Sequence, residues 1–277
     1  MLPPIASRFV AGESDAAALE RARRLNDRGV GAILNLLGEH YDRPERAGAD
    51  ADTYERLVGD IGRTDLDACV SVKPSQLGLD AGADTFRRTL SRVVDRADEA
   101  GVFVWIDMED HTTTDATLDA FEAETRRHGG TVGVCLQANL RRTRADLERL
   151  AGLPGKVRLV KGAYDEPAEI AYTDHQRVNE AYRDHLGYLF RAFDGGVAVG
   201  SHDPAMIEHA RGLHDEYGTD FEIQMLMGVR EDAQFELARE FDVYQYAPYG
   251  SRWLSYFYRR VAERKENLAF AVRAIVN

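Results

Sequence analysis

One stretch of the sequence, from Arg158 to Tyr164, combines a strand pattern with two cationic side chains. It begins with Arg158 and alternating apolar residues, and it ends in the small residues Gly162 and Ala163. Arg158 and Lys161 lie three residues apart, so on an extended strand they face opposite ways unless the strand ends between them. The small residues leave room for a flat ligand to approach the backbone. We therefore interpret this stretch as a strand end that opens onto a binding site.

Polar residues also follow the other predicted strands, whose bodies are apolar. In a parallel α/β barrel the side chains that follow the strands gather at one face, where the chemistry takes place. The residues at the eight predicted strand ends are Glu39, Lys73, Asp107, Gln137, Lys161, His202, Gln224 and Tyr246. Two of the four lysines of the chain are among them, which indicates an anionic ligand or a Schiff-base nucleophile.

Three of these residues also have a purely structural interpretation. Lys73 precedes Pro74 and fits an exposed loop start, and Asp107 fits a turn cap. His202 stands beside Asp203-Pro204, which reads as a helix start. The convergence of the set, rather than any single residue, favours a functional site.

Helix and strand patterns alternate along the whole chain. Strands are predicted at 31–37, 68–72, 102–106, 131–136, from Arg158 onward, and at 197–199, 221–225 and 243–246; helices are predicted at 15–28, 46–61, 84–100, 114–128, 144–150, 174–193, from Pro204 onward and at the C-terminus. Eight βα units within roughly 250 residues match a (β/α)8 barrel of the TIM type. A doubly wound sheet is the competing architecture, but no G-x-G-x-x-G motif follows the first strand.

Composition narrows the class of protein. With 277 residues, 44% hydrophobic and 30% charged, the chain reads as soluble, globular and cytoplasmic, without a signal peptide or membrane span. The net charge of -12 argues against a general nucleic-acid binder. Acidic excess with few lysines suggests a salt-adapted (halophile) protein, although a high-GC genome would also favour arginine. Cys69 and Cys135 lie in apolar runs and are expected to be buried free thiols.

A metal site is a minor alternative, because the run from Asp107 to His111 is dense in ligand types. His202, Asp107, Glu109 and His111 are ligand types, but the sequence contains no H-x-H or H-E-x-x-H spacing. The G-x-S-x-G elbow of α/β-hydrolases is also missing from the sequence.

The C-terminal segment is rich in aromatic residues and arginines. On a helix Tyr256, Arg259, Arg260 and Glu263 share one face, and Trp253 joins that side. This face fits a salt-bridged helix packed on the barrel. Adjacent guanidinium groups beside tyrosines also suit the binding of a small carboxylate, and both interpretations can hold for one helix.

Taken together, these motifs resemble the proline dehydrogenase family, which includes the dehydrogenase domain of proline utilisation A and short monofunctional enzymes. The resemblance covers most of the chain, in order. The matching residues are Ser71-Val72-Lys73, Ile106-Asp107, Gln137-Ala138, Arg158 to Tyr164, Ser201-His202, Tyr246-Ala247-Pro248, Gly250 and Tyr256-x-x-Arg259-Arg260-x-x-Glu263.

The resemblance implies a single FAD-binding domain over residues 1–277. Its fold would be a distorted (β/α)8 barrel with an N-terminal helix and with the last helix over the barrel mouth. L-Proline would be oxidised to Δ1-pyrroline-5-carboxylate, the first step of proline degradation to glutamate, by hydride transfer from C5 to flavin N5. The electrons would pass to a quinone, with peripheral contact to the inner face of the membrane. A separate pyrroline-5-carboxylate dehydrogenase would oxidise the product.

The resemblance also implies residue roles. Asp107 and Arg158 would be catalytic, Arg158 lying by flavin N5. Substrate binding would fall to Lys73, Arg259 and Arg260 at the carboxylate, to Tyr246, Leu226, Tyr256 and Ala163 around the ring, and to Glu39, which would pair with the first arginine. Cofactor contacts would come from Met108, Gln137, Arg158, Val160, Lys161, Gly162 and Ala163, from Thr173, Ser201 and His202 toward the adenine end, and from Glu263.

Four positions depart from the family pattern, most of them toward the adenine end of the cofactor: Asp165, His175, Ser201 and Met227. Three other classes stay open. A flavin reductase resembling methylenetetrahydrofolate reductase would not need the paired arginines. A Schiff-base aldolase would use Lys161 or Lys73 without a flavin, and a binding protein on this scaffold would turn nothing over.

Overall fold

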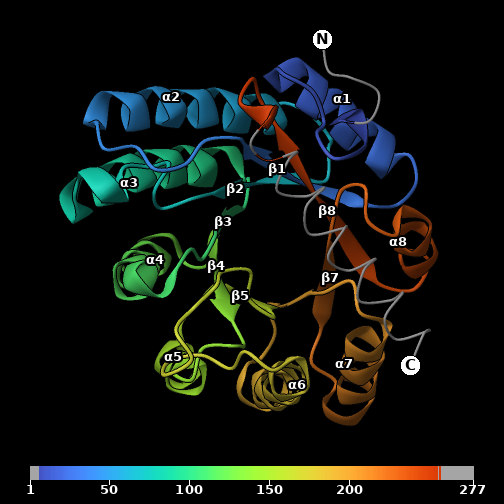
Figure 1. Ribbon diagram of the computed structural model, residues 1–277. Helices are drawn as coiled ribbons and strands as arrows, with labels where there is room; N and C mark the ends of the chain where they lie inside the picture. Colours follow the sequence, from blue (N-terminus) through green and yellow to red (C-terminus); the bar gives the residue numbers. More distant parts are fainter. Residues whose placement is uncertain (1–5, 255, 257–277) are drawn as a thin grey trace.

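In the computed structural model, which describes residues 6–254 and 256, the strands close into a parallel barrel (Figure 1). The described strands are β1 (Gly31–Leu36), β2 (Ala68–Val72), β3 (Val104–Ile106), β4 (Val132–Gln137), β5 (Lys156–Val160), β6 (Val197–Gly200), β7 (Phe221–Leu226) and β8 (Asp242–Tyr249). Each strand pairs with the next in chain order. β1 pairs with β8 from Gly31–Tyr244 to Leu36–Tyr249, which closes the ring. The predicted (β/α)8 architecture is confirmed.

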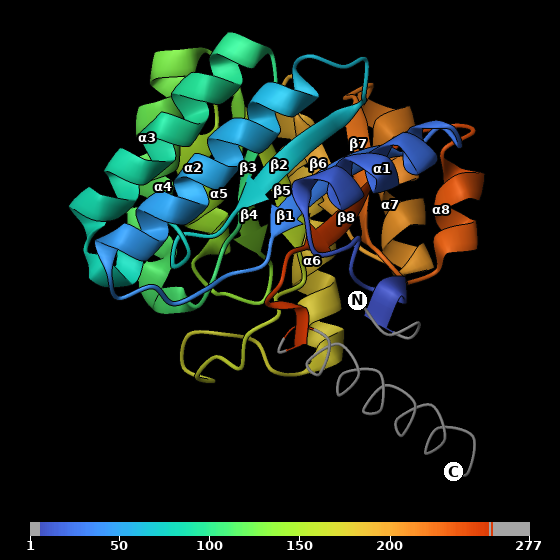
Figure 2. The same ribbon diagram turned by 90° about the horizontal axis from the view of Figure 1, so that it is seen from above.

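Helices surround the strands in chain order (Figure 1). The described helices are α1 (Asp15–Asn26), α2 (Pro44–Ile61), α3 (Ala83–Ala100), α4 (Thr114–His128), α5 (Thr143–Leu150), α6 (His175–Ala192), α7 (Pro204–Tyr217) and α8 (Glu231–Leu237), with 3-10 turns η1 (Ala6–Arg8), η2 (Leu79–Ala81) and η3 (His111–Thr113). α2 and α3 lie side by side on one flank (Figure 2). None of these helices is both long enough and apolar enough to cross a bilayer.

Side-chain caps explain several helix starts. Ser14 precedes α1 and accepts a hydrogen bond from the backbone N–H of Ala17. Asp174 and Asp203 cap α6 and α7 in the same way, and each satisfies an N–H that has no partner within its helix. Thr114 is the first residue of α4, and the turn η3 that precedes it is capped by Asp110.

Two differences from the predicted elements have clear physical causes. β8 runs through Pro248 to Tyr249, past the strand end predicted at Tyr246. Pro248 lacks an N–H, but Pro248 and Tyr249 still pair with Asn35 and Leu36 of β1, so the strand continues to its end. α8 was missed because it is short and Gln234 is its buried residue, so it has no apolar stripe.

Side chains alternate between the barrel interior and the helix layer. Ile33, Cys69, Trp105 and Ala198 form an apolar cluster of their own, separate from the larger core between strands and helices. Both cysteines are buried free thiols, as predicted. Polar side chains from β5 and β7 also pair with each other: Lys156 with Glu222, and Arg158 with Gln224. The strand bodies are therefore less apolar than predicted.

The N-terminal helix α1 packs against the outside of β1 and β8. Next to it, residues 9–12 bind the end of β8: Ala11 N–H donates to Pro248, and Gly250 N–H donates to Gly12. Phe9 and Tyr256 belong to one small apolar cluster beside them. The segment before α1 thus anchors the chain just beyond β8; residues 255 and 257–277 lie outside the described residues.

Candidate active site

A cavity of about 630 Å³ lies at the carboxyl ends of the barrel strands. In Figure 2, the long loop after β5 and the end of β8 lie at this same end of the barrel. The cavity is lined by Asn35, Lys73, Asp107, Met108, Cys135, Arg158, Val160, Lys161, Gly162, Ala163, Tyr164, Asp165, Gly200, Ser201, His202, Asp203, Gln224, Met225, Leu226, Tyr246 and Tyr256. Its position matches the face at which barrel enzymes carry their chemistry.

A buried carboxylate connects four strands at the floor of this cavity. Asp107 follows β3, and its Oδ1 accepts hydrogen bonds from Ser71 Oγ (2.7 Å) and from the guanidinium of Arg158. The other oxygen, Oδ2, accepts from Tyr246 OH at 2.7 Å. Arg158 also donates to Gln224 at 3.0 Å. Residues from β2, β5, β7 and β8 therefore meet around the Asp107 side chain.

This network keeps Asp107 ionised. Burial alone would raise the pKa of Asp107, but the positive charges of Arg158 and Lys73 and the hydrogen bonds from Ser71 and Tyr246 hold it below its ordinary value. Burial and the neighbouring carboxylate raise the pKa of Tyr246 well above its ordinary value. Tyr246 therefore stays a neutral donor beside a carboxylate.

Lys73 brings a second cation to the cavity wall. It follows β2 and is half-buried. Across residues 6–254 and 256, no hydrogen bond or ion pair engages its ammonium group. A half-buried ammonium with no such partner at a cavity is suited to bind an anionic ligand.

The end of β5 separates its two cations, as predicted from their spacing. β5 ends at Val160, Arg158 points into the barrel, and Lys161 turns toward the β6–α7 loop, where it pairs with Asp203 at 2.7 Å. This ion pair holds the pKa of Asp203 below its ordinary value, against the effect of burial. Lys161 is therefore engaged in an ion pair, which disfavours it as a Schiff-base nucleophile.

The turn after β5 lies tightly against the β4–α5 loop. Gly162 has φ of +121°, and a β-carbon there would lie 2.2 Å from Asn139 Oδ1. Gln137 Oε1 accepts a hydrogen bond from the Ala163 N–H at 3.4 Å. The positive φ and the close contact with Asn139 both favour glycine, and Gly162 lines the cavity through its backbone.

The β6 end supplies Ser201 and His202 to the cavity lining. His202 Nε2 accepts from the backbone N–H of Leu226 at 2.8 Å, which joins the ends of β6 and β7. Ser201 Oγ accepts from the backbone N–H of Asp203 at 3.2 Å. His202 thus joins the ends of β6 and β7, and Ser201 holds the start of the loop that follows β6.

Most of the residues predicted for the site converge on this cavity. The predicted residues that line it are Lys73, Asp107, Met108, Arg158, Val160, Lys161, Gly162, Ala163, Ser201, His202, Leu226, Tyr246 and Tyr256. Gln137 is buried next to the lining and donates to the Glu109 carbonyl. Glu39 lies half-buried after β1, and Thr173 is exposed; neither belongs to the lining. Arg259, Arg260 and Glu263 lie outside the described residues.

The structure adds lining residues that the sequence reasoning left out of the site. They are Asn35, Cys135, Tyr164, Asp165, Gly200, Asp203, Gln224 and Met225. Gln224 is one of the eight predicted strand ends, but the family resemblance assigns it no role. Asn35 and Cys135 lie within strands, where only the two-residue alternation of an inward face could have identified them.

The residues considered as metal ligands near the site do not converge. Glu109 accepts from the N–H and hydroxyl of Ser75, both at 2.7 Å. His111 instead contacts Glu166. In the part of the chain that the structure describes, ligand atoms converge elsewhere, between α3 and α4.

Comparisons with known proteins agree on one family. The family model described as proline dehydrogenase matches residues 18–273. The proline dehydrogenase of Deinococcus radiodurans is 37% identical over 282 residues, covering 98% of this chain and 90% of that protein. Proline dehydrogenase 1 of Bacillus subtilis subsp. natto is 34% identical over 275 residues, with the same coverage.

A solved structure shows the same fold in a larger protein. Proline utilization A from Bdellovibrio bacteriovorus, inactivated by N-propargylglycine, superimposes with a TM-score of 0.83 at 23% identity. The match covers 92% of this chain and 32% of that one, so this chain spans about a third of the larger protein.

Proposed function

Since this chain belongs to the proline dehydrogenase family, we propose that it oxidises L-proline to Δ1-pyrroline-5-carboxylate with bound FAD as the electron acceptor. The observation that carries the proposal is the network in which Asp107 joins Arg158 and Tyr246 at the floor of the strand-end cavity. Residues from four strands fix these groups, so their positions are set before any ligand binds.

The size and lining of the cavity support the proposal of a bound flavin. Its volume of about 630 Å³ lies within the usual range for cofactor sites. The backbone at Gly162 forms a wall that a β-carbon would disrupt, and Arg158 places a permanent positive charge at the floor. The proposed cofactor contacts are Met108, Gln137, Arg158, Val160, Lys161, Gly162 and Ala163, with Thr173, Ser201, His202 and Glu263 toward the adenine end.

FAD, when bound, supplies the acceptor for a hydride from C5 of proline. The protein contributes charge and position. Arg158 is held by Asp107 and Gln224, and its fixed charge would stabilise negative charge that develops on the acceptor. Asp107 keeps Tyr246 oriented, and the Tyr246 ring lines the cavity.

Substrate recognition would combine one carboxylate clamp with an apolar wall. The ammonium of Lys73 faces the cavity without an ion-pair partner among the described residues, which suits a carboxylate. The proposed clamp comprises Lys73, Arg259 and Arg260; the proposed wall around the ring comprises Tyr246, Leu226, Tyr256 and Ala163, with Glu39 at the closing side. Tyr256 lines the cavity. On a helix, Arg259 and Arg260 would lie on the same face as Tyr256.

We also propose that the electrons leave to a quinone, which would require peripheral contact with a membrane, and that a separate dehydrogenase consumes the product. The competing classes differ in what they need. A folate-type reductase does not need a carboxylate clamp of this kind. An aldolase needs an unpaired lysine; Lys161 is paired with Asp203, so its nucleophile would be Lys73.

Product identification distinguishes these classes. The protein, reconstituted with FAD, is incubated with isotope-labelled L-proline and a soluble quinone, and the products are identified by mass spectrometry. Labelled Δ1-pyrroline-5-carboxylate with stoichiometric quinol supports the proposal. Oxidation of a nicotinamide cofactor with a folate would refute it. So would a carbonyl substrate that becomes attached to Lys73, without any flavin, when borohydride reduces their Schiff base.

A further inference from the structure

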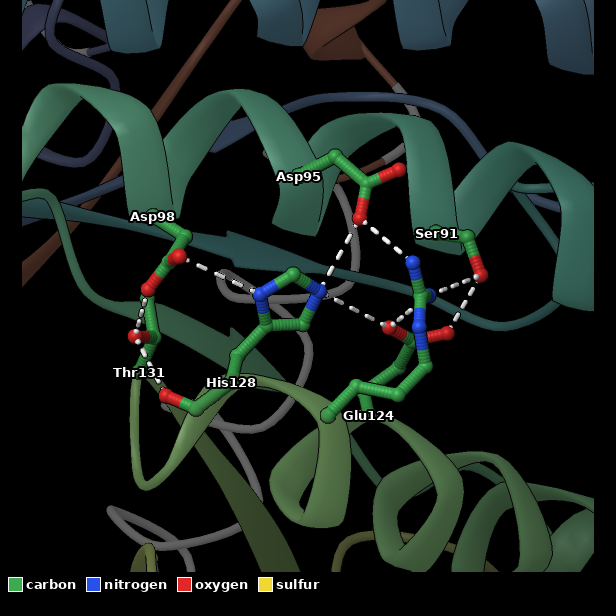
Figure 3. A network of polar contacts seen from close by, with 7 residues as sticks. Ser91, Asp95, Asp98, Glu124, His128 and Thr131 are labelled. Atoms are coloured by element: carbon green, nitrogen blue, oxygen red, sulfur yellow. Dashed lines mark hydrogen bonds and ion pairs between the residues drawn. The ribbon is translucent and has the colours of Figure 1, made fainter.

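Helices α3 and α4 bring three metal-ligand side chains together on the outside of the barrel, away from the cavity. Asp95 comes from α3, and Glu124 and His128 come from successive turns of α4 (Figure 3). One ligand atom of each lies within 4.8 Å of the other two. The helix spacing of four residues places Glu124 and His128 on the same face, toward Asp95.

Asp98 orients the imidazole of His128 from the side opposite Asp95 and Glu124. Its Nδ1 lies 3.3 Å from Asp98 Oδ2, and Asp98 is itself held by Thr131 Oγ1 at 2.7 Å (Figure 3). A carboxylate on the second ring nitrogen is the usual arrangement behind a metal-binding histidine, because it fixes the ring and raises its basicity. Figure 3 shows the ring between Asp98 on one side and Asp95 and Glu124 on the other.

His128 Nε2 faces two carboxylate oxygens without a hydrogen bond of proper geometry to either. It lies 2.9 Å from Asp95 Oδ1 and 3.7 Å from Glu124 Oε2. The nitrogen is fully buried and has no hydrogen-bond partner in the described part of the chain. The ring nitrogen thus lies within ion-pair distance of both oxygens and forms a regular hydrogen bond with neither. A cation placed between the three atoms would contact all of them.

The spacing of these atoms suits a small transition-metal ion. Zinc bonds of about 2.0–2.2 Å at a tetrahedral angle place neighbouring ligand atoms roughly 3.4 Å apart. The two distances from Nε2, 2.9 Å and 3.7 Å, lie on either side of that value. One imidazole with two carboxylates is a ligand set found at zinc sites, and half-exposed Asp95 leaves the fourth position open to water.

We propose that Asp95, Glu124 and His128 form a binding site for a divalent transition-metal ion of the zinc type, with Asp98 as the residue that orients His128. The site joins α3 to α4 and has no part in proline oxidation. Because the metal ion would bind the folded chain and not the unfolded chain, it would stabilise the protein in proportion to the logarithm of the free metal concentration.

One cation already contacts the same oxygens. Arg127 donates to Glu124 Oε2 at 2.8 Å and lies 2.9 Å from Asp95 Oδ1, with its side chain 49% exposed. Glu124 keeps its other oxygen on Ser91. A metal ion would therefore take the place of the Arg127 guanidinium, which can move into solvent. It follows that removing Arg127 should tighten metal binding, a result that a purely structural salt-bridge network does not predict.

The test uses the untagged full-length protein and titrates Zn²⁺ by calorimetry and Co²⁺ by visible absorption. We expect one ion per chain, with the intense Co²⁺ bands of a site of low coordination number. Arg127→Gln should tighten binding about tenfold, Asp98→Asn should weaken it roughly 10- to 100-fold, and His128→Gln should abolish it. His209→Gln is the control, because the hydrogen bond described for the His209 ring is to the backbone carbonyl of Arg183, at 3.4 Å, and not to a carboxylate.

Two results would overturn the proposal: no saturable binding in either the wild type or Arg127→Gln, or binding that survives His128→Gln with unchanged affinity. Since a variant of His128 could disturb α4, Asp95→Asn provides a second test at an exposed position, and it should weaken binding at least tenfold. Melting curves without metal establish that each variant is folded before its affinity is compared.

Discussion

Arg158 and Asp107 form an ion pair inside the barrel, 5% and 8% exposed, respectively, at the floor of the cavity. The pair joins β5 to the end of β3, and Tyr246 from β8 completes it. Two buried charges held this close depend on each other, because each would be costly to leave alone in a site of low dielectric constant.

The first prediction concerns this mutual dependence. Arg158→Met leaves Asp107 buried without its main counter-charge, and Asp107→Asn leaves Arg158 in the same state. Each single change should lower the free energy of unfolding by about 3–5 kcal/mol. The double variant should lose clearly less than the sum. Urea unfolding of the four proteins, all saturated with FAD, measures the coupling; additive losses would contradict the ion-pair account.

The second prediction follows from the lowered pKa of Asp107. Its folded-state pKa lies below its unfolded value of about 3.9, so its stabilising contribution is complete above that pH. The contribution is lost as the pH falls from there through the lower folded pKa. The difference in unfolding free energy between wild type and Asp107→Asn should therefore be constant above about pH 6 and shrink on acidification below about pH 4. If this difference in unfolding free energy instead grew on acidification, folding would raise the pKa of Asp107, contrary to the account.

The third prediction separates orientation from binding at Tyr246. Tyr246→Phe keeps the ring at the cavity but removes the hydroxyl that donates to Asp107 at 2.7 Å. A hydrogen bond to a charged group contributes about 1.5–3 kcal/mol. We expect FAD content to be unchanged and the rate of flavin reduction by proline to fall at least tenfold, measured by anaerobic stopped flow. An unchanged rate would remove Tyr246 from the reaction.

The fourth prediction tests the cavity wall at Gly162. Gly162→Ala forces a β-carbon to 2.2 Å from Asn139 Oδ1 and should therefore release most of the FAD. Gly82 is the matched control, because its φ of +123° is nearly the same but no atom lies within 4 Å of the added carbon. Gly82→Ala carries the same backbone strain, so it should lose stability yet retain FAD. Equal FAD loss in both variants would mean that strain, and not the wall, is responsible.

Much of this arrangement could be predicted from the sequence, because strand ends in a parallel barrel meet at one face. Lys73, Asp107 and His202 each follow an apolar strand, and the cavity includes all three. The stretch from Arg158 to Lys161 likewise predicted a strand end at a binding site, and β5 ends at Val160, between two cations that both line the cavity.

Other features depend on contacts that span the chain and leave no local signal. Asn35 lies inside β1, and its place in the lining follows only from which face of the strand turns inward. Glu124 and His128 have helix spacing, but Asp95 comes from a different helix, so no motif search could join the three. The missed helix α8 has no apolar stripe because its buried residue is Gln234.

The most direct test of the central claim is the response of the bound flavin to L-proline. The purified protein, reconstituted with FAD if necessary, is made anaerobic and mixed with L-proline, and the flavin absorption band is followed. The account predicts that L-proline bleaches the band and that hydroxyproline and pipecolate do not. A protein that cannot be loaded with FAD, or a loaded protein whose flavin stays oxidised in saturating L-proline, would contradict it.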